Sequence, residues 1–409
     1  MVKEIRSDER ITILALSWRD IRNPKGGGAE IHTHEMLSRL DKERFRAIHF
    51  SPMFKGGVEE EEIDGVLYLR KGGIFSVIWY AMRFYKKNKN KIDFVVDQCN
   101  THRFFTKFWV EKKKRIFYIH QLCRELWNIM LPPPFSWVGK MMETPMLKLN
   151  KDDITITVSE STKRDLIKVG YDDKKIYIVP NGLNFKEKQY SELAYKSEDP
   201  IYIYVGRFVP YKGANVAIEA FGKIKEKYPK AKLWLVGRAN DEFVETYLIP
   251  VANRFGLSFG NEEENDVVLW GFVDENIKLE LQEKATALLF PAQREGWGII
   301  VLEAGAMGTP SIVYNSPGCI DAVNYGKAGY LCKCNDATEL VRLMQDAVDK
   351  PDEYEKIRHA AYNYCTSFKW EKNVKIFEKL LLDLQQKNAR KIIEELKDEC
   401  KNTQMENDM

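Results

Sequence analysis

The sequence predicts an α/β protein made of two domains, each built on a parallel sheet. Strand-like segments alternate with helix-like segments along the chain, a pattern typical of parallel sheets with crossover helices. A polar stretch from Pro180-Asn181-Gly182 to about Pro200 separates two such series, and we interpret it as an interdomain linker. The chain has 409 residues, of which 44% are hydrophobic, enough for two substantial cores.

Short apolar and β-branched segments mark the strands of each series. Ligands of such sheets bind at the carboxyl ends of the strands, so the space between the two domains is the expected binding site. In the first half the predicted strands are residues 11–16, 47–51, 94–97, 116–119, 154–158 and 176–179. In the second half they are residues 201–205, 232–236, 267–269, 287–290 and 311–314.

A glycine-rich loop follows the first predicted strand and precedes a helix predicted over residues 31–40. Gly26, Gly27 and Gly28 let the backbone approach a bulky anion, and the helix start behind them supplies N–H donors. Consecutive glycines are not the spaced pattern of dinucleotide sites, so a flexible turn is the alternative interpretation. His32 and His34, two residues apart at this helix start, do not face one another as a metal pair would.

Two cations follow the first strand of the second half. The strand ends at Gly206, and the next loop presents Arg207 and Lys212 before a helix predicted to run to about residue 228. Cations at the carboxyl edge of a parallel sheet are placed to hold a diphosphate. Taken alone, Arg207 and Lys212 also fit ordinary surface charges.

Two glutamates flank a glycine-rich bend further along the chain. Glu295 precedes the bend of Gly296, Trp297 and Gly298, and Glu303 lies two turns into a helix predicted over residues 298–307. The backbone N–H groups at that helix start favour a phosphate, and the Glu303 carboxylate can accept hydrogen bonds from vicinal hydroxyls. The alternative is a capping carboxylate followed by a solvated glutamate.

Together these segments resemble the retaining nucleotide-sugar glycosyltransferases of family four, the glycosyl transferases group 1. The resemblance implies the GT-B fold: two Rossmann-like α/β domains that face a deep interdomain cleft, with a C-terminal helix crossing back. The implied parts are an acceptor-binding domain over residues 1–182, a nucleotide-sugar domain over 183–365 and a helical segment over 366–409. The matching blocks are Gly26-Gly27-Gly28-Ala29-Glu30, Val158-Ser159-Glu160-Ser161, Val179-Pro180-Asn181-Gly182, Gly206-Arg207 with Lys212-Gly213, and Glu295 to Glu303.

The resemblance also implies residue roles. Arg207 and Lys212 would bind the donor diphosphate, Glu303 the ribose and Glu295 the donor sugar, while His120 matches a family histidine near that sugar. Without the family match, His120 at a strand end would be read as structural. The implied catalytic residues are His120, Arg207, Lys212 and Glu295. The implied donor-binding residues are Gly26, Gly27, Arg207, Lys212, Glu295, Gly296, Trp297, Gly298 and Glu303.

The implied reaction moves a hexose-type sugar from a UDP- or GDP-sugar to a hydroxyl acceptor, with a lipid-linked glycan and a polysaccharide as candidates. The leaving phosphate would take the acceptor proton, so no side-chain nucleophile is assigned. No Asp-x-Asp pair occurs in the sequence, so no metal is expected, and no cofactor is needed because the nucleotide sugar is a co-substrate. A non-catalytic partner subunit and a nicotinamide-dependent oxidoreductase are the alternatives.

Basic and aromatic residues gather in two clusters of the first domain, from Arg83 to Lys91 and from Phe104 to Arg115. Lysine and arginine attract anionic headgroups, and aromatic side chains enter the membrane interface. An anionic membrane surface is therefore a candidate partner, and a solvated helix face over core aromatics is the alternative. The formal net charge of only +3 gives no indication of nucleic-acid binding.

Four further features complete the sequence prediction. No apolar run approaches the roughly 20 residues of a membrane span, so we expect a cytoplasmic protein, with association at the cytoplasmic membrane face as an option. The seven cysteines fit reduced thiols. Residues 131–137, rich in proline, predict an extended turn. The tail from residue 370 to about 400 predicts a helix with an apolar stripe of Ile376, Leu380, Leu381 and Leu384.

Overall fold

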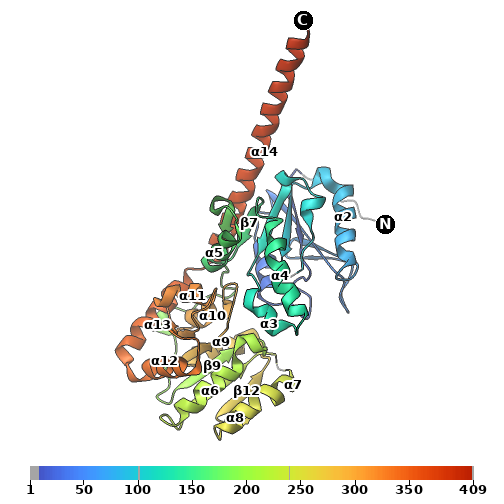
Figure 1. The fold of residues 1–409 in the computed structure, drawn as a ribbon. Coiled ribbons are helices and arrows are strands. Elements are labelled where there is room, and N and C mark those ends of the chain that lie inside the picture. The colour runs from blue at the N-terminus through green and yellow to red at the C-terminus, as the bar shows by residue number, and fades with distance from the viewer. Residues whose placement is uncertain (1–8, 100–101, 239, 408–409) are drawn as a thin grey trace.

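The computed structural model describes residues 9–99, 102–238 and 240–407, and these residues form two α/β lobes (Figure 1). The first lobe is built on a sheet from residues 11–178, and the second lobe on a sheet from residues 201–331. The predicted fold class, two parallel-sheet α/β units with a C-terminal helix, is confirmed.

The first sheet runs in the order β3-β4-β2-β1-β5-β6-β7-β8, and its pairs are parallel except for β3 and β4. β1 is buried along its whole length, which explains why it reads as a continuous apolar run rather than an alternating one. The strands are β1 (Ile11–Leu16), β2 (Phe45–Ser51), β3 (Glu60–Ile63), β4 (Val66–Arg70), β5 (Phe94–Cys99), β6 (Arg115–Ile119), β7 (Ile154–Thr157) and β8 (Ile176–Ile178).

The β3–β4 hairpin is the part of this sheet that the sequence did not predict. The acidic run of residues 59–62 reads as a solvated segment, and β3 is indeed a partly exposed edge strand. Asp64 and Gly65 have φ angles of 51° and 83°, as a tight hairpin turn requires. The hairpin also positions the buried Arg70, whose Nε lies 2.7 Å from Asp20 Oδ2.

The second sheet runs in the order β11-β12-β10-β9-β13-β14-β15, and its pairs are parallel. Tyr202 and Tyr204 pack into one core cluster, whereas Ile203 and Val205 pack into another, so helices cover both faces of β9. The strands are β9 (Ile201–Val205), β10 (Lys232–Val236), β11 (Phe259–Gly260), β12 (Val267–Gly271), β13 (Ala287–Phe290), β14 (Ser311–Val313) and β15 (Tyr330–Leu331).

Most helices connect successive strands, the last three follow β15, and the bounds of several differ from the prediction. α1 begins at Gly28 rather than at residue 31, and α6 ends at Lys225 rather than near residue 228. The α-helices are α1 (Gly28–Ser38), α2 (Ser76–Asn88), α3 (Trp127–Met130), α4 (Phe135–Lys148), α5 (Glu160–Val169), α6 (Ala214–Lys225), α7 (Asp241–Phe243), α8 (Ile249–Arg254), α9 (Glu275–Lys284), α10 (Ile299–Ala306), α11 (Cys319–Ala322), α12 (Ala337–Asp349), α13 (Pro351–Thr366) and α14 (Trp370–Asn407).

The long helix α14 returns from the second lobe to the first, beyond which it projects (Figure 1). Its first turns pack into the core cluster that holds residues of β1 and α1, and Arg39, which caps the C-terminal end of α1, pairs with Glu371 at 3.0 Å. Ile376 was predicted on the packed stripe, which is wrong: its side chain is 38% exposed. The buried stripe consists of Trp370, Val374, Phe377, Leu380 and Leu381.

Within the described residues, the structure contains no helix with both the length and the apolar character that a bilayer span requires. α14 has the length, but it carries charged side chains at close intervals.

Candidate active site

Loops that follow strands of both sheets meet between the lobes. A Cβ placed on Gly28, at the start of α1, would lie 3.0 Å from Cδ1 of Ile299, at the start of α10. A Cβ on Gly296 would lie 3.0 Å from the carbonyl oxygen of His120. These two glycines therefore permit close contact between the lobes, at positions where a larger side chain would hold the lobes apart.

The glycine-rich loop forms the start of α1 and positions a buried acid. Gly26 closes a turn by donating its N–H to the Asn23 carbonyl at 2.8 Å. Gly27 is the N-cap residue, and its N–H donates to Oε2 of Glu30 at 2.7 Å. Burial raises the pKa of the Glu30 carboxyl, although the Gly27 N–H opposes this rise. Gly26 and Gly27 thus lie at the lobe boundary, beside Gly28.

The structure brings together Lys212 and Glu295 of the second lobe. Their side chains form an ion pair and are only 14% and 15% exposed. The loop that carries Glu295 is fixed on both sides of the pair, because Gln293 N–H donates to Tyr211 O at 2.9 Å and Glu295 N–H donates to Pro317 O at 3.0 Å. The predicted proximity of the cationic loop and the glutamate loop is thus present in the structure.

Arg207 is exposed and lies two residues after the end of β9. Its Nη2 donates to Tyr211 Oη at 3.2 Å. Burial lowers the pKa of Arg19 in the first lobe, and the charge of Arg207 lowers it further. Burial raises the pKa of Glu30, and the charge of Arg207 opposes that rise. Arg207 therefore lies close enough to Arg19 and Glu30 of the first lobe to affect their pKa values.

Glu303 is buried in α10, and the structure pairs it with a cation that the sequence prediction did not consider. Lys278 of α9 places its Nζ 2.7 Å from Glu303 Oε2. Burial raises the pKa of Glu303 to about 7, against the lowering effect of Lys278. The solvated-glutamate alternative is therefore wrong. In this structure Glu303 belongs to a different ion pair from Glu295.

His120 is the end of a buried hydrogen-bond chain in the first lobe. Its Nε2 lies 2.9 Å from Oη of Tyr118, the same hydroxyl bonds to Nδ1 of His32, and His32 Nε2 lies 2.9 Å from the Val179 carbonyl. Burial lowers the pKa of His32 to about 4 and that of His120 well below its ordinary value. Both imidazoles are therefore neutral at pH 7, and Nδ1 of His120 is buried without a hydrogen-bond partner.

Trp297 and Gly298 complete the bend between Glu295 and α10. The Trp297 indole is 7% exposed and packs edge-on against Phe368, with ring centroids 5.0 Å apart. Gly298 is the N-cap of α10 with φ 95°, a conformation that favours glycine. Trp297 therefore anchors this bend in the core through its side chain, so a contact with the donor would have to come from its backbone.

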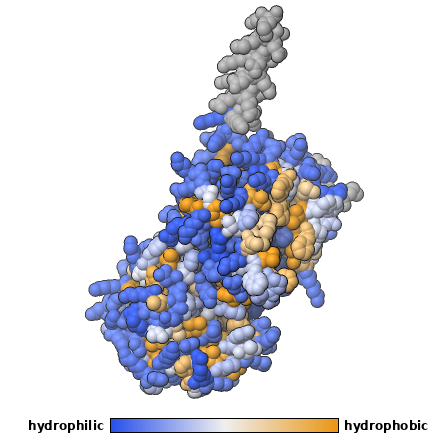
Figure 2. Space-filling view, in the orientation of Figure 1, coloured by the Kyte–Doolittle hydropathy of each residue, from blue (hydrophilic) through white to orange (hydrophobic). Residues whose placement is uncertain are grey.

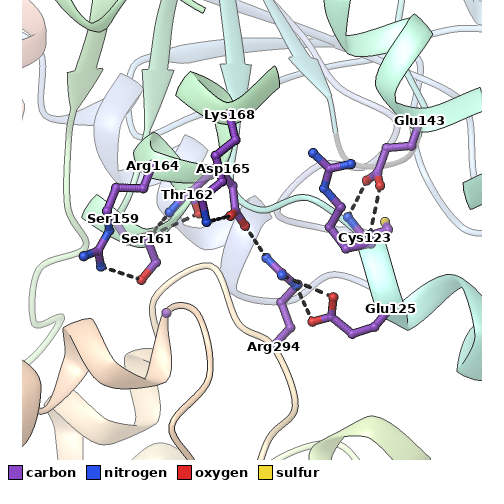
Figure 3. A network of polar contacts seen from close by, with 12 residues as sticks. Cys123, Glu125, Glu143, Ser159, Ser161, Thr162, Arg164, Asp165, Lys168 and Arg294 are labelled. Carbon is purple, nitrogen blue, oxygen red and sulfur yellow. Dashed lines mark hydrogen bonds and ion pairs between the residues drawn. The ribbon is translucent and has the colours of Figure 1, made fainter. Parts of the chain in front are cut away.

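Arg294 links the lobes and was missed by the sequence prediction (Figure 3). Its Nε lies 2.7 Å from Glu125 Oε1 and its Nη1 lies 2.6 Å from Asp165 Oδ2, both in the first lobe. A second link joins Ser161 N–H to Asp321 Oδ1 at 3.2 Å. The partners of Arg294 lie 169 and 129 residues away in sequence, and no local pattern identifies such a pair.

A cavity of about 340 Å³ lies in the first lobe between the sheet edge and α2. None of its lining residues belongs to the Lys212 and Glu295 pair. The lining residues are Phe50, Glu59, Glu60, Leu69, Arg70, Lys71, Trp79, Tyr80, Arg83 and Phe84.

Two family models divide the chain at the boundary between the lobes. Residues 26–187 match Glycosyltransferase Family 4, and residues 185–364 match Glycosyl transferases group 1. The chain belongs to the group 1 glycosyltransferases. The glycogen synthase of Mycobacterium tuberculosis is 25% identical to this group 1 chain over 225 residues, which cover 54% of this chain and 52% of that protein. The chain spans about half the length of the curated relatives it matches.

Solved structures match the fold of this group 1 chain over both lobes. Sucrose-phosphate synthase from Thermosynechococcus elongatus superposes with a TM-score of 0.72 at 17% identity, covering 92% of this chain and 100% of that one. Anabaena HepE in complex with UDP and glucose superposes with a TM-score of 0.65 at 15% identity, covering 91% and 100%. Both lobes therefore adopt the GT-B arrangement.

Proposed function

We propose that this group 1 protein is a retaining glycosyltransferase that moves a hexose-type sugar from a nucleotide diphosphate sugar to a hydroxyl acceptor. The observation that carries the proposal is the half-buried pair of Lys212 and Glu295, at an edge of the second sheet that also carries Arg207. Two cations and an acid at one sheet edge match the needs of a diphosphate joined to a sugar.

The donor would bind with its diphosphate between Arg207 and Lys212. Lys212 is neutralised by Glu295, and an arriving diphosphate would take over part of that contact. Glu295 would then accept hydrogen bonds from sugar hydroxyls. The N-terminal ends of α1 and α10 add partial positive charge on either side. Glu303 is proposed to bind the ribose, which requires its carboxylate to exchange Lys278 for hydroxyl groups.

The proposed reaction breaks the bond between the anomeric carbon and the diphosphate oxygen. Negative charge then grows on the leaving phosphate, where Arg207 and Lys212 stabilise it more strongly in the transition state than in the ground state. The acceptor hydroxyl attacks from the same face and gives its proton to the departing phosphate oxygen, so the anomeric configuration is retained. Neutral His120 is proposed to contact the donor sugar through Nδ1, its unpaired ring nitrogen, which requires this buried atom to become accessible when the donor binds.

The donor nucleotide and the metal requirement also belong to the proposal. HepE was solved with UDP and glucose, and on this basis we place UDP-sugars first and GDP-sugars second. Because Arg207 and Lys212 supply positive charge at the diphosphate, we expect transfer to persist in the presence of EDTA. The acceptor is proposed to be a lipid-linked or polysaccharide glycan bound by the first lobe, and the cytoplasmic location stays a prediction.

A screen of UDP- and GDP-sugars tests the function most directly. A donor that binds the native state raises the melting temperature by mass action, by an amount that grows with donor concentration. Release of nucleoside diphosphate, with and without a glycan acceptor, then separates an enzyme from a non-catalytic partner subunit. Donor binding without any release would favour the partner subunit. A screen in which no nucleotide sugar shifts the melting temperature or is consumed would overturn the proposal.

A further inference from the structure

An uncovered apolar surface lies on the first lobe, in the segment that contains α3 and the start of α4. Seven large apolar side chains of this segment are between 37% and 68% exposed, whereas the buried residues of α4 are Ser136 and Leu147. Folded proteins rarely leave so many neighbouring large apolar side chains in water without a partner. We call these residues the apolar surface: Met130, Leu131, Phe135, Trp137, Val138, Met141 and Met142.

Helix geometry concentrates these side chains. The sequence predicted an extended turn up to residue 137, and this is wrong at its end, since α4 begins at Phe135. Residues three or four apart lie on the same helix face, so Val138 extends the face of Phe135, and Met141 extends the face of Trp137. In Figure 2, hydrophobic residues gather over the region of the first lobe where Figure 1 places α4.

The surroundings of the apolar surface are basic. Residues 102–153 contain ten lysines and arginines but only three glutamates and two aspartates, of which Asp153 pairs with Arg115. Two of these glutamates are engaged: Glu125 pairs with Arg294 of the second lobe, and Glu143 accepts hydrogen bonds from the Cys123 and Arg124 N–H groups. The third, Glu111, lies 3.4 Å from Lys113. The exposed charge around the apolar surface is therefore predominantly positive.

The two basic clusters predicted from the sequence contribute charge rather than apolar contact. Phe84, Tyr85 and Phe104 are buried, so the prediction that these aromatics meet a membrane is wrong. The core beside the sheet buries these three side chains, whereas most lysines of both clusters are exposed and Lys91 and Lys114 are partly buried. Among the aromatic residues of the second cluster, Phe108 is exposed, at 70%. At the start of α2, Phe75 is 85% exposed and adds a further apolar side chain to this lobe.

We propose that the apolar surface docks on the boundary between headgroups and hydrocarbon of an anionic bilayer. Trp137 and the methionines would enter the interface, where indole and thioether side chains are favourably placed, while nearby lysines reach anionic headgroups. A second copy of the chain is a poorer occupant, because a two-fold contact would bring two basic surroundings together and like charges repel. An anionic bilayer satisfies both the apolar area and the positive charge.

Docking in this way would place the lobe boundary close to the bilayer. Glu125, which precedes α3, already contacts Arg294 of the second lobe, and Figure 1 shows α3 on the side of the first lobe that faces the second. A membrane-linked acceptor would then reach the proposed site without leaving the bilayer. This consequence rests on the proposed transfer activity, whereas bilayer binding does not, and the two can fail separately.

Vesicle flotation with the full chain tests the docking. Wild-type protein should float with vesicles of phosphatidylcholine and phosphatidylglycerol, less with phosphatidylcholine alone, and less at high salt. The double variant Trp137→Ser/Met141→Ser should lower the bound fraction by about tenfold, because both side chains leave the interface. The matched control is Phe272→Ser, because Phe272 is 70% exposed but lies on the second lobe. This variant should bind the vesicles as well as wild type does.

Two results would overturn the proposal. One is equal flotation of the double variant and wild type, with unchanged melting temperatures showing that both are folded. The other is a wild-type dimer by light scattering that becomes a monomer in the double variant, which would assign the apolar surface to a second copy. The proposal is supported if the double variant no longer floats with the vesicles while its molar mass in light scattering and its nucleotide-sugar turnover in detergent equal those of wild type.

Discussion

Lys212 and Glu295 form an ion pair although 83 residues separate them in the sequence. β9 and β13 are neighbours in the second sheet, so the loops that follow their carboxyl ends meet. The ion pair fixes the Lys212 ammonium and the Glu295 carboxylate relative to each other at the proposed donor site. Such preorganisation reduces the rearrangement that donor binding requires.

Lys212→Ala should lower turnover at saturating donor by about 100-fold to 1000-fold, because in the proposed site the leaving phosphate loses a stabilising cation. The protein should still fold, at a cost of about 1–3 kcal/mol, because Glu295 is only 15% exposed and loses its cation; the melting temperature checks that the variant is folded. Nucleoside diphosphate release measures turnover. The matched control is Lys225→Ala, which removes a similarly half-buried lysine paired with Asp266 at 2.6 Å. Equal turnover of the two variants would contradict the role of Lys212.

Arg294→Ala should destabilise the protein by about 1–3 kcal/mol, because it leaves Asp165 as a nearly buried carboxylate without its cation. Urea unfolding followed by fluorescence measures the free energy. Arg342 of α12 offers a control: it also pairs with two acids, but its side chain is 46% exposed. Arg342→Ala should therefore cost at most about 1 kcal/mol. A smaller loss for Arg294→Ala than for Arg342→Ala would contradict a role of Arg294 in joining the lobes.

Stability should fall with rising pH because of Glu303. Its pKa is raised from 4.5 to about 7 by burial, so between these values the folded protein binds more protons than the unfolded chain. The free energy of unfolding then decreases as pH rises through this window and levels off above it, by at most about 3 kcal/mol. Glu303→Gln should show a flatter profile in urea unfolding at about pH 5 and about pH 7.5. Parallel profiles for the two proteins would exclude this titration.

The sequence predicted the strand framework well but not the contacts between lobes. β1, β9, β10 and β13 have the predicted bounds, because each is a short apolar run between turn residues. The ion pair of Lys212 with Glu295 was not predicted, and it results from the adjacency of β9 and β13 in the second sheet. Contacts that join the lobes depend instead on how two rigid bodies meet, as with Arg294, and a single sequence carries no local pattern for such contacts.

Local exceptions have equally specific reasons. The edge strand β3 carries an acidic run that is typical of a solvated segment, yet the Asp64-Gly65 turn folds it onto β4. Glu303 was expected to be free for a ligand, but Lys278 comes from a neighbouring helix whose contact with α10 is a tertiary property. Spacing within one helix could not reveal that partner.

Tyr118→Phe tests whether the hydrogen-bond chain positions His120. The change leaves one ring nitrogen of His120 and one of His32 without their hydroxyl partner, at a cost of about 1–3 kcal/mol in the free energy of unfolding. It should also lower turnover more than it raises the KM for donor, because the His120 ring loses its fixed orientation. Tyr171→Phe is the matched control, since that buried hydroxyl donates to Leu147 O at 2.7 Å outside the site. Equal turnover in both variants would assign Tyr118 a purely structural role.

Gly28→Ala should weaken donor binding without destabilising the protein. Alanine favours helix over glycine by about 0.5–1 kcal/mol, so α1 itself should not suffer. The added methyl, however, would lie 3.0 Å from Ile299 Cδ1 and press the starts of α1 and α10 apart. Donor affinity, measured by calorimetry, should therefore fall while the melting temperature stays equal or rises.

The double variant Gly28→Ala/Ile299→Val provides the decisive comparison, because valine lacks the Cδ1 methyl that the new Cβ would meet. If the contact between α1 and α10 sets the donor site, affinity should recover in the double variant, and Ile299→Val alone should change it little. The two changes would then be non-additive, as expected for residues in direct contact. If the losses of donor affinity in the two single variants instead add up in the double variant, Gly28 acts through its own backbone. The close approach of the two helix starts would then not govern donor binding.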